Sequence, residues 1–260
     1  MDQQLQKKWV DGIPVQWVLP RESPDERRLI VFLPSFGGSN RQVADLLIDI
    51  ADRGSIGLSI DPWQHGDRGS ESRDAIFARV FSAFRKNMWP ILGQTSIDIL
   101  RVIDWAIAEF HIQSPVRIGG LSMGGDVAIA AAGIDTRIER VFAVVATPDW
   151  LRPGMRDLMN PNTLIAQGEA DDFAQFFFDS LNPMSHLERY RRNMHLTFLC
   201  GEQDNHVPPD GAERFKHAFA VVADDCFAQV DVQLVEGMSH MDSMDRTLWW
   251  PRCLSELTGR

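Results

Sequence analysis

Gly120-Leu121-Ser122-Met123-Gly124-Gly125 carries the strongest fold signal in the chain. It follows the apolar run Pro115-Val116-Arg117-Ile118-Gly119, which has the character of a strand. A serine on a sharp turn between a strand and a helix needs very small residues two positions before and after it, because a larger side chain would strike the neighbouring backbone. Gly120 and Gly124 meet that need. The hydroxyl is then exposed beside the free N–H groups of a helix start, an arrangement called a nucleophile elbow.

The flanking sequence favours the elbow over an ordinary glycine turn. The pattern G-x-S-x-G alone is weak, since glycine is a common residue. Here a strand-like run precedes the motif and an alanine-rich stretch with helical character, Asp126 to Gly133, follows it. The combination predicts strand, turn and helix in that order.

Length and composition predict one globular domain over residues 1–260. The chain is 44% hydrophobic and 24% charged, enough to bury a large core and too apolar for a disordered chain. The net charge of -10 excludes nucleic acid as an expected partner, because such binding requires clustered positive charge.

The sequence predicts a cytoplasmic protein without a membrane span or a metal site. Residues 1–10 are polar and carry no apolar core of a signal peptide. No apolar stretch reaches the roughly 20 residues that span a bilayer. Cys200, Cys226 and Cys253 are odd in number and have no zinc-ligand spacing, so buried, inert thiols in a reducing compartment are expected.

Strand-like and helix-like segments alternate along the chain, which predicts an α/β fold. Continuous apolar runs of strand length are typical of strands buried on both faces of a parallel sheet. A helical apolar spacing covers Thr95 to Phe110. We expect a mostly parallel sheet of about eight strands with helices on both faces, preceded by an antiparallel hairpin around Asp11-Gly12. The strand-like segments are 8–10, 13–18, 28–33, 56–60, 115–119, 141–145, 196–200 and 230–235.

Two further loops carry residues that complement the serine. Asp204 follows the strand that ends at Cys200, and His240 follows the strand that ends at Val235. Reactive groups of parallel sheets gather where the strands end. Serine, acid and histidine therefore occur in the chain order of one hydrolase superfamily.

The sequence resembles the α/β-hydrolase superfamily over nearly its whole length. Four motifs carry the resemblance: the elbow, Gly201 to Pro208, Gly237 to His240, and Leu33 to Gly38. The last looks like the loop that contributes to the oxyanion hole, although Pro34-Ser35 stands where the superfamily often has His-Gly.

The resemblance implies a catalytic triad of Ser122, Asp204 and His240. His240 would act as the general base, and Asp204 would orient its imidazole and stabilise the imidazolium. The backbone N–H groups of Phe36 and Met123 would form the oxyanion hole. No metal and no organic cofactor are expected.

Other residues compete for these roles. His206 is an alternative to His240, with a surface or lid contact as its simpler role, and Asp149 is an alternative to Asp204. Asp242 is too close to His240 in sequence to be preferred. The loop Asp61 to Gly69, with Asp61, His65 and Arg68, resembles a superfamily loop whose polar side chains either brace the site or touch substrate.

The finer resemblance is to small bacterial esterases related to dienelactone hydrolases and to the catalytic domains of prolyl oligopeptidases. It rests on the Asp61 to Gly69 loop and on Asn182 to Leu187. It implies a serine carboxylesterase that cleaves a small to medium, partly apolar ester through an acyl-enzyme. A thioesterase, an amidase, a C–C bond hydrolase and a non-catalytic binding protein remain alternatives.

Two insertions, residues 70–93 and 148–192, are expected to form helical caps over the site. Both are rich in aromatic residues and methionine, which could line the pocket or pack the caps: Phe77, Phe81, Phe84, Met88, Trp89, Met155, Met159, Phe173, Phe176, Phe177 and Phe178. Trp249 and Trp250 leave two alternatives, a homodimer surface and packing of the last helix onto the sheet.

Overall fold

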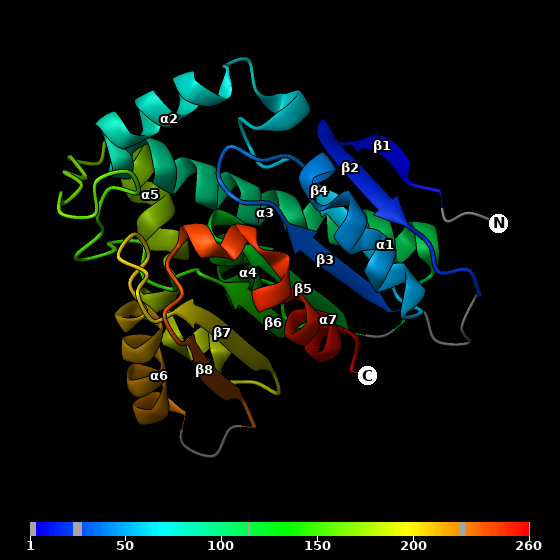
Figure 1. Cartoon of the computed structure of the whole chain (residues 1–260). Coiled ribbons are helices and arrows are strands. Elements are labelled where there is room, and N and C mark those ends of the chain that lie inside the picture. Colours follow the sequence, from blue (N-terminus) through cyan, green and yellow to red (C-terminus); the bar gives the residue numbers. More distant parts are fainter. Residues whose placement is uncertain (1–3, 23–27, 114, 224–226, 260) are drawn as a thin grey trace.

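The chain forms an eight-stranded, mostly parallel sheet with helices on both faces (Figure 1). This computed structural model describes residues 4–22, 28–113, 115–223 and 227–259. The spatial order of the strands is β1-β2-β4-β3-β5-β6-β7-β8. Their bounds are β1 Gln6–Val10, β2 Ile13–Val18, β3 Leu29–Leu33, β4 Ile56–Ile60, β5 Val116–Leu121, β6 Ile138–Val144, β7 His195–Gly201 and β8 Gln229–Val235.

The first two strands form the antiparallel hairpin that the sequence predicts. β1 pairs with β2 and β2 with β4 in antiparallel fashion, whereas all later pairs are parallel. Asp11 and Gly12 connect the hairpin with positive φ angles of 49° and 79°. Two positive φ angles match the right-handed twist of the strands, which is why an Asp-Gly pair is suited to this turn.

Side chains of the central strands alternate between two cores. Leu29, Val31 and Leu33 of β3 face one core, and Ile30 and Phe32 face the other. Such double burial explains the continuous apolar run in the sequence.

Helices α1 and α7 cover one face, and α3, α4 and α6 cover the other, while α5 packs on α3 (Figure 1). The α-helices are α1 Ala44–Asp52, α2 Arg73–Ser82, α3 Phe84–Phe110, α4 Met123–Ile134, α5 Asp172–Leu181, α6 Asp210–Val222 and α7 Trp250–Thr258. Short 3-10 helices are η1 Asn40–Val43, η2 Gly66–Arg68, η3 Pro183–Ser185, η4 Leu187–Tyr190, η5 Met241–Met244 and η6 Arg246–Leu248. Within the described part of the chain, no helix combines the length and apolarity that crossing a membrane requires.

The two inserted regions are less uniformly helical than the sequence predicts. Residues 70–93 comprise α2 and the first turns of α3, and α3 continues without a break to Phe110. In the second region, helix is confined to α5, η3 and η4, and residues 149–171 form turns and irregular backbone. Glycine and proline at 153, 154, 161 and 168 explain the missing helix, since both residues interrupt regular backbone hydrogen bonding.

The C-terminal tryptophans pack the last helix onto the sheet. Trp249 and Trp250 are 1% and 7% exposed. Their rings contact Phe32 of β3 at centroid distances of 5.9 and 5.3 Å. Of the two alternatives for this pair, the structure selects core packing.

The described cysteines are buried, as expected. Burial raises the pKa of Cys200 to about 12 and the pKa of Cys253 well above its usual value. Thiols in this state are poor nucleophiles, because the thiolate is the reactive form. Cys226 lies outside the described residues.

Candidate active site

Ser122 occupies the turn between β5 and α4 in a backbone conformation that few non-glycine residues adopt. Its φ and ψ are 53° and -119°. The turn is held by hydrogen bonds: the Ser122 N–H donates to Val144 O at 2.8 Å, and the Ser122 carbonyl accepts from Gly125 N at 2.8 Å. Strained positions of this kind persist only where the surroundings enforce them, and they cluster at functional sites.

The glycines of the motif are required by close backbone contacts. A Cβ on Gly120 would lie 2.6 Å from Gly125 N, and a Cβ on Gly124 would lie 2.6 Å from Pro34 O. Neither neighbour can move away independently, because both are backbone atoms. The elbow and the backbone at Leu33-Pro34 therefore pack directly on each other.

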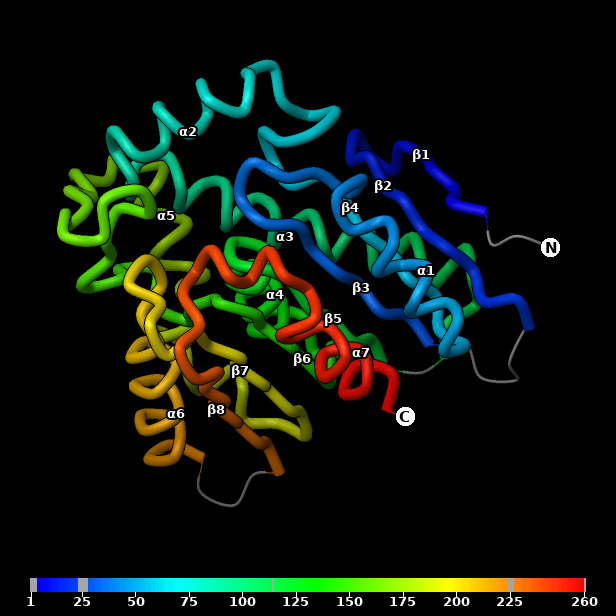
Figure 2. The backbone as a smooth tube through the Cα atoms, viewed as in Figure 1, coloured from blue at the N-terminus to red at the C-terminus, as the bar shows by residue number. Residues whose placement is uncertain are grey.

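The structure brings Ser122, His240 and Asp204 together from three loops. Ser122 Oγ lies 3.1 Å from His240 Nε2, and His240 Nδ1 lies 2.7 Å from Asp204 Oδ2. In Figure 2 the loop after β8 passes over the start of α4, beside the loop after β7. A serine hydroxyl can donate its proton to Nε2 when Nδ1–H is held by the carboxylate.

Asp204 is anchored by its own loop. Its side chain is fully buried, and Oδ1 accepts hydrogen bonds from the backbone N–H groups of His206 at 2.9 Å and Val207 at 2.8 Å. The two backbone N–H groups fix Oδ1, and Oδ2 is thereby aimed at the third donor, His240 Nδ1.

The competing acids are engaged elsewhere. Asp149 Oδ2 binds Arg214 Nη1 at 2.8 Å, and its Oδ1 accepts from Leu151 N. Asp242 Oδ2 accepts from both Ser239 N and Ser239 Oγ at 2.7 Å. Neither carboxylate contacts the imidazole of His240.

His206 lies in the site next to His240 rather than on the surface. The two rings meet edge to face with centroids 4.9 Å apart, and His206 is 7% exposed. Its Nδ1 lies 2.8 Å from Arg156 O, so Nδ1 carries the proton. Burial, and next the nearby His240, lower the pKa of His206 to about 4, which keeps its ring neutral at neutral pH.

The loop from Asp61 to Gly69 braces the site from outside the pocket. Asp61 accepts from Asn40 N at 2.8 Å and from Asp67 N at 2.7 Å, and Arg68 pairs with buried Asp98 at 2.7 Å. The His65 ring packs edge-on against Phe36 with centroids 5.2 Å apart. None of Asp61, His65 and Arg68 lines the pocket at Ser122, which agrees with a supporting role.

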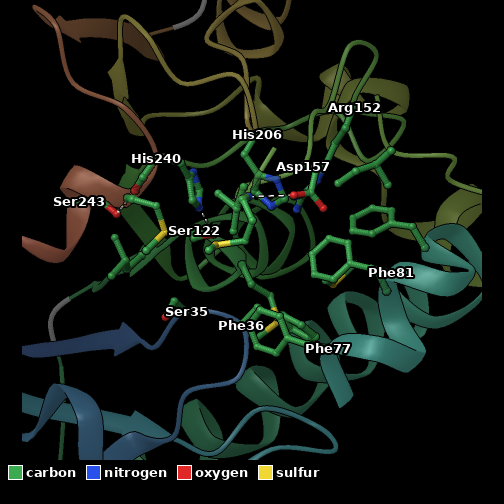
Figure 3. Close-up of a pocket in the computed structure, with 18 of the residues that line it drawn as sticks. Ser35, Phe36, Phe77, Phe81, Ser122, Arg152, Asp157, His206, His240 and Ser243 are labelled. Carbon is green, nitrogen blue, oxygen red and sulfur yellow. Dashed lines mark hydrogen bonds between the residues drawn. The ribbon is translucent and has the colours of Figure 1, made fainter. Parts of the chain in front are cut away.

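A pocket of about 330 Å³ opens at Ser122 (Figure 3). Phe36 and Met123, the residues predicted to supply oxyanion N–H groups, both line it. Several aromatic and methionine side chains of the two insertions also line the pocket. They are Phe77, Phe81, Phe84 and Met88 from the first insertion and Met159 from the second. Trp89 instead stacks on Phe178 with centroids 4.3 Å apart and donates to Trp150 O at 3.0 Å.

A buried ion pair beneath the pocket was not predicted from the sequence. Asp126, one turn after Ser122 in α4, pairs with Arg152, and the side chains are 0% and 4% exposed. Asp126 also accepts from Thr147 N at 2.8 Å. Burial raises the pKa of Asp126 to about 6, and the Arg152 guanidinium opposes that rise. The sequence does hold one signal for this pair, because Asp126 is the only charged residue of the apolar helix α4 and a buried carboxylate requires a partner.

The described residues include no cluster of three or more histidine, cysteine or acidic side chains positioned to hold a metal ion.

Comparison with known proteins places the chain in a family. A model of the Prolyl oligopeptidase family matches residues 81–244, which is more than half of the chain. The chain belongs to this family. It is accordingly a serine hydrolase of the α/β-hydrolase fold. No curated protein matches it in a sequence search.

Solved structures support the family's fold over the whole length. TT1662 from Thermus thermophilus is 19% identical with a TM-score of 0.69, covering 98% of this chain and 99% of that one. A putative dienelactone hydrolase from Klebsiella pneumoniae is 14% identical with a TM-score of 0.69, covering 99% and 98%. Est1E from Butyrivibrio proteoclasticus, solved with ferulic acid, is 16% identical with a TM-score of 0.65, covering 96% of each chain. At these identities the similarity establishes the fold.

Proposed function

We propose that this member of the prolyl oligopeptidase family hydrolyses a small to medium, partly apolar carboxylic ester with Ser122 as nucleophile. One observation carries the proposal: the continuous contact from Ser122 Oγ to His240 Nε2 at 3.1 Å and from His240 Nδ1 to Asp204 at 2.7 Å. A nucleophile, a base within hydrogen-bond reach and a group that orients the base form the signature of covalent acyl transfer.

The first half-reaction forms an acyl-enzyme. Ser122 Oγ attacks the ester carbonyl carbon while its proton moves to His240 Nε2. The tetrahedral intermediate then collapses, and His240 returns the proton to the departing alkoxide, which leaves as the alcohol. Water repeats the sequence on the acyl-enzyme and releases the carboxylic acid. Asp204 holds the imidazole and stabilises its cationic form throughout.

The oxyanion would be bound by the backbone N–H groups of Met123 and Phe36. Met123 begins α4, so its N–H belongs to the positive end of a helix. Phe36 lies in the loop that packs on Gly124, which keeps its backbone close to the elbow. One such donor contributes about 3 to 4 kcal/mol in comparable sites.

The pocket favours an apolar acyl or aryl group. Phe77, Phe81 and Phe84 come from α2 and the start of α3 and line the cavity with Met88. Its volume of about 330 Å³ is at the small end for ligand pockets, which suits a small to medium substrate.

The direct test is the intact mass of the protein after treatment with a small fluorophosphonate. We expect one adduct on the wild type and on Ser70→Ala, which changes an exposed serine, and no adduct on Ser122→Ala. A folded wild type that takes no adduct would contradict the proposal. Release of p-nitrophenol from p-nitrophenyl butanoate and hexanoate then tests ester hydrolysis itself.

Amide hydrolysis is the second candidate, because the matching family is one of peptidases. The same triad can protonate an amine leaving group. Matched acyl p-nitrophenyl esters and p-nitroanilides separate the two activities. Turnover of the anilide within about tenfold of the ester in kcat/KM would make the protein an amidase.

A further inference from the structure

Polar side chains interrupt the aromatic wall of the pocket, and two of them are a buried guanidinium and a buried imidazole. Arg152 and His206, together called the polar corner here, line the cavity and are 5% and 7% exposed. Figure 3 places both beside Asp157, across the pocket from Phe36 and Phe77. Burying a guanidinium and an imidazole is costly, so such groups are expected to have specific partners.

Arg152 uses only part of its hydrogen-bonding capacity within the protein. Its Nη2 binds Asp126, and its guanidinium carbon lies 5.2 Å from the centre of the Phe84 ring. Gln167 Nε2 donates to the Arg152 carbonyl at 2.9 Å and fixes the loop. Among the residues that the structure describes, none accepts a hydrogen bond from Nη1. The Nη1 group is therefore available as a donor to a molecule in the pocket.

His206 offers a hydrogen-bond acceptor, where Arg152 offers a donor. Its Nδ1–H is committed to Arg156 O, so Nε2 bears a lone pair and can only accept a hydrogen bond. Contacts with the rings of His240 at 4.9 Å and Phe81 at 5.8 Å fix its orientation. No described residue donates to Nε2. Burial holds the pKa of His206 near 4, which keeps this lone pair free.

The charges next to the polar corner favour a neutral group. Arg73, the other arginine that lines the pocket, lies over the ring of Phe77, across the pocket from this corner (Figure 3). The positive charge of Arg152 is compensated by fully buried Asp126. Asp157 lines the same pocket, with Oδ1 accepting from Met159 N and Asn160 N at 2.8 Å. A carboxylate in this corner would meet a second carboxylate and a guanidinium that is already paired. A neutral group avoids that repulsion.

We propose that the polar corner recognises a neutral group of the substrate that both accepts and donates a hydrogen bond, a hydroxyl or a secondary amide. Arg152 Nη1 donates to the oxygen of this group, and its O–H or N–H donates to His206 Nε2. The inference rests on the proposed function and specifies its substrate class. Arg152 and His206 are specificity-determining residues in this account.

Matched p-nitrophenyl esters test the inference, with kcat/KM as the readout. The hydroxyl pair is 3-(4-hydroxyphenyl)propanoate against 3-(4-methylphenyl)propanoate. The amide pair is N-acetyl-β-alaninate against hexanoate, which has the same chain length. We expect the wild type to prefer the polar member of at least one pair by about tenfold, and the pair that responds identifies the group.

The variants Arg152→Lys and His206→Phe should bring that preference close to unity. Lysine keeps a cation against Asp126, and phenylalanine keeps a ring against His240, so both are designed to preserve packing. Arg53→Lys and His217→Phe are matched controls at exposed positions and should retain the wild-type preference. Because the readout is a ratio of two substrates, a general loss of activity does not imitate the expected result.

Three results would overturn the inference. They are equal rates for both members of each pair in the wild type, an unchanged preference in both folded variants, and a preference for 3-(4-carboxyphenyl)propanoate over its methyl counterpart. The wild-type ratios decide the matter even where a variant does not fold. Hydrolysis of hexanoate without any polar preference rejects only the inference. Absence of both hydrolysis and fluorophosphonate labelling rejects the proposed function.

Discussion

Replacing His206 by glutamine should make the protein less sensitive to mild acid. The pKa of His206 is lowered from its usual value of 6.5 to about 4, chiefly by burial and next by His240. Between these pH values the unfolded chain binds more protons than the folded protein. The free energy of unfolding therefore rises with pH in this window and falls as the solution is acidified.

The size of the effect follows from the two pKa values. At pH 7.5 the His206 side chain is neutral in both the folded and the unfolded protein and hardly changes the free energy of unfolding. At pH 5.0 it lowers the free energy of unfolding of the wild type by about 2 kcal/mol, and below pH 4 this decrease approaches about 3 kcal/mol. His206→Gln lacks this titration, so its loss of stability between pH 7.5 and 5.0 should be smaller by about 2 kcal/mol.

Urea denaturation followed by tryptophan fluorescence measures this difference. The chain has eight tryptophans, including buried Trp150 and Trp249. The control variant His217→Gln changes an exposed histidine and should follow the wild type. Asp126 and other acids titrate in all three proteins, so their contributions largely cancel. Losses of stability for the wild type and His206→Gln that agree within about 0.5 kcal/mol, the order of the extrapolation error, would show that His206 does not have a lowered pKa in the folded protein.

Three further predictions concern the elbow, the acid and the buried ion pair. Gly120→Ala should abolish fluorophosphonate labelling and lower the melting temperature, because the new Cβ would lie 2.6 Å from Gly125 N; a fully labelled, equally stable variant would contradict this. Asp204→Asn should reduce kcat for ester hydrolysis by about 10³- to 10⁴-fold with little change in KM, since the imidazole loses its anionic partner, and a loss below tenfold would exclude Asp204 as the acid. Arg152→Met should cost about 3 to 5 kcal/mol in urea unfolding at pH 7.5 by leaving Asp126 buried without its cation, and Arg152→Met combined with Asp126→Asn should recover most of that loss; equal stabilities of the single and double variants would show that the pair is not coupled.

Much of the fold could be predicted because its signals are local. Continuous apolar runs mark strands buried on both faces, as at Leu29–Leu33, and the Asp11-Gly12 pair marks a turn that needs two positive φ angles. The insertions were predicted less well. The first joins a core helix without a break, and the second holds its shape through contacts such as Gln167 with Arg152, which no periodic pattern announces.

The amino-acid sequence alone predicts the elbow, the succession of strands along the chain, and the set of Ser122, Asp204 and His240. Gly120, Ser122 and Gly124 encode their geometry locally, and parallel strands deliver Asp204 and His240 to the same edge of the sheet. The residues that surround these three became evident from the folded structure. Asp126 and Arg152 lie 26 positions apart, and His206 becomes a neutral pocket residue only through burial against His240 and Phe81. The burial of His206 and the choice of Arg152 as partner of Asp126 depend on how distant segments pack, and no local sequence pattern identifies either.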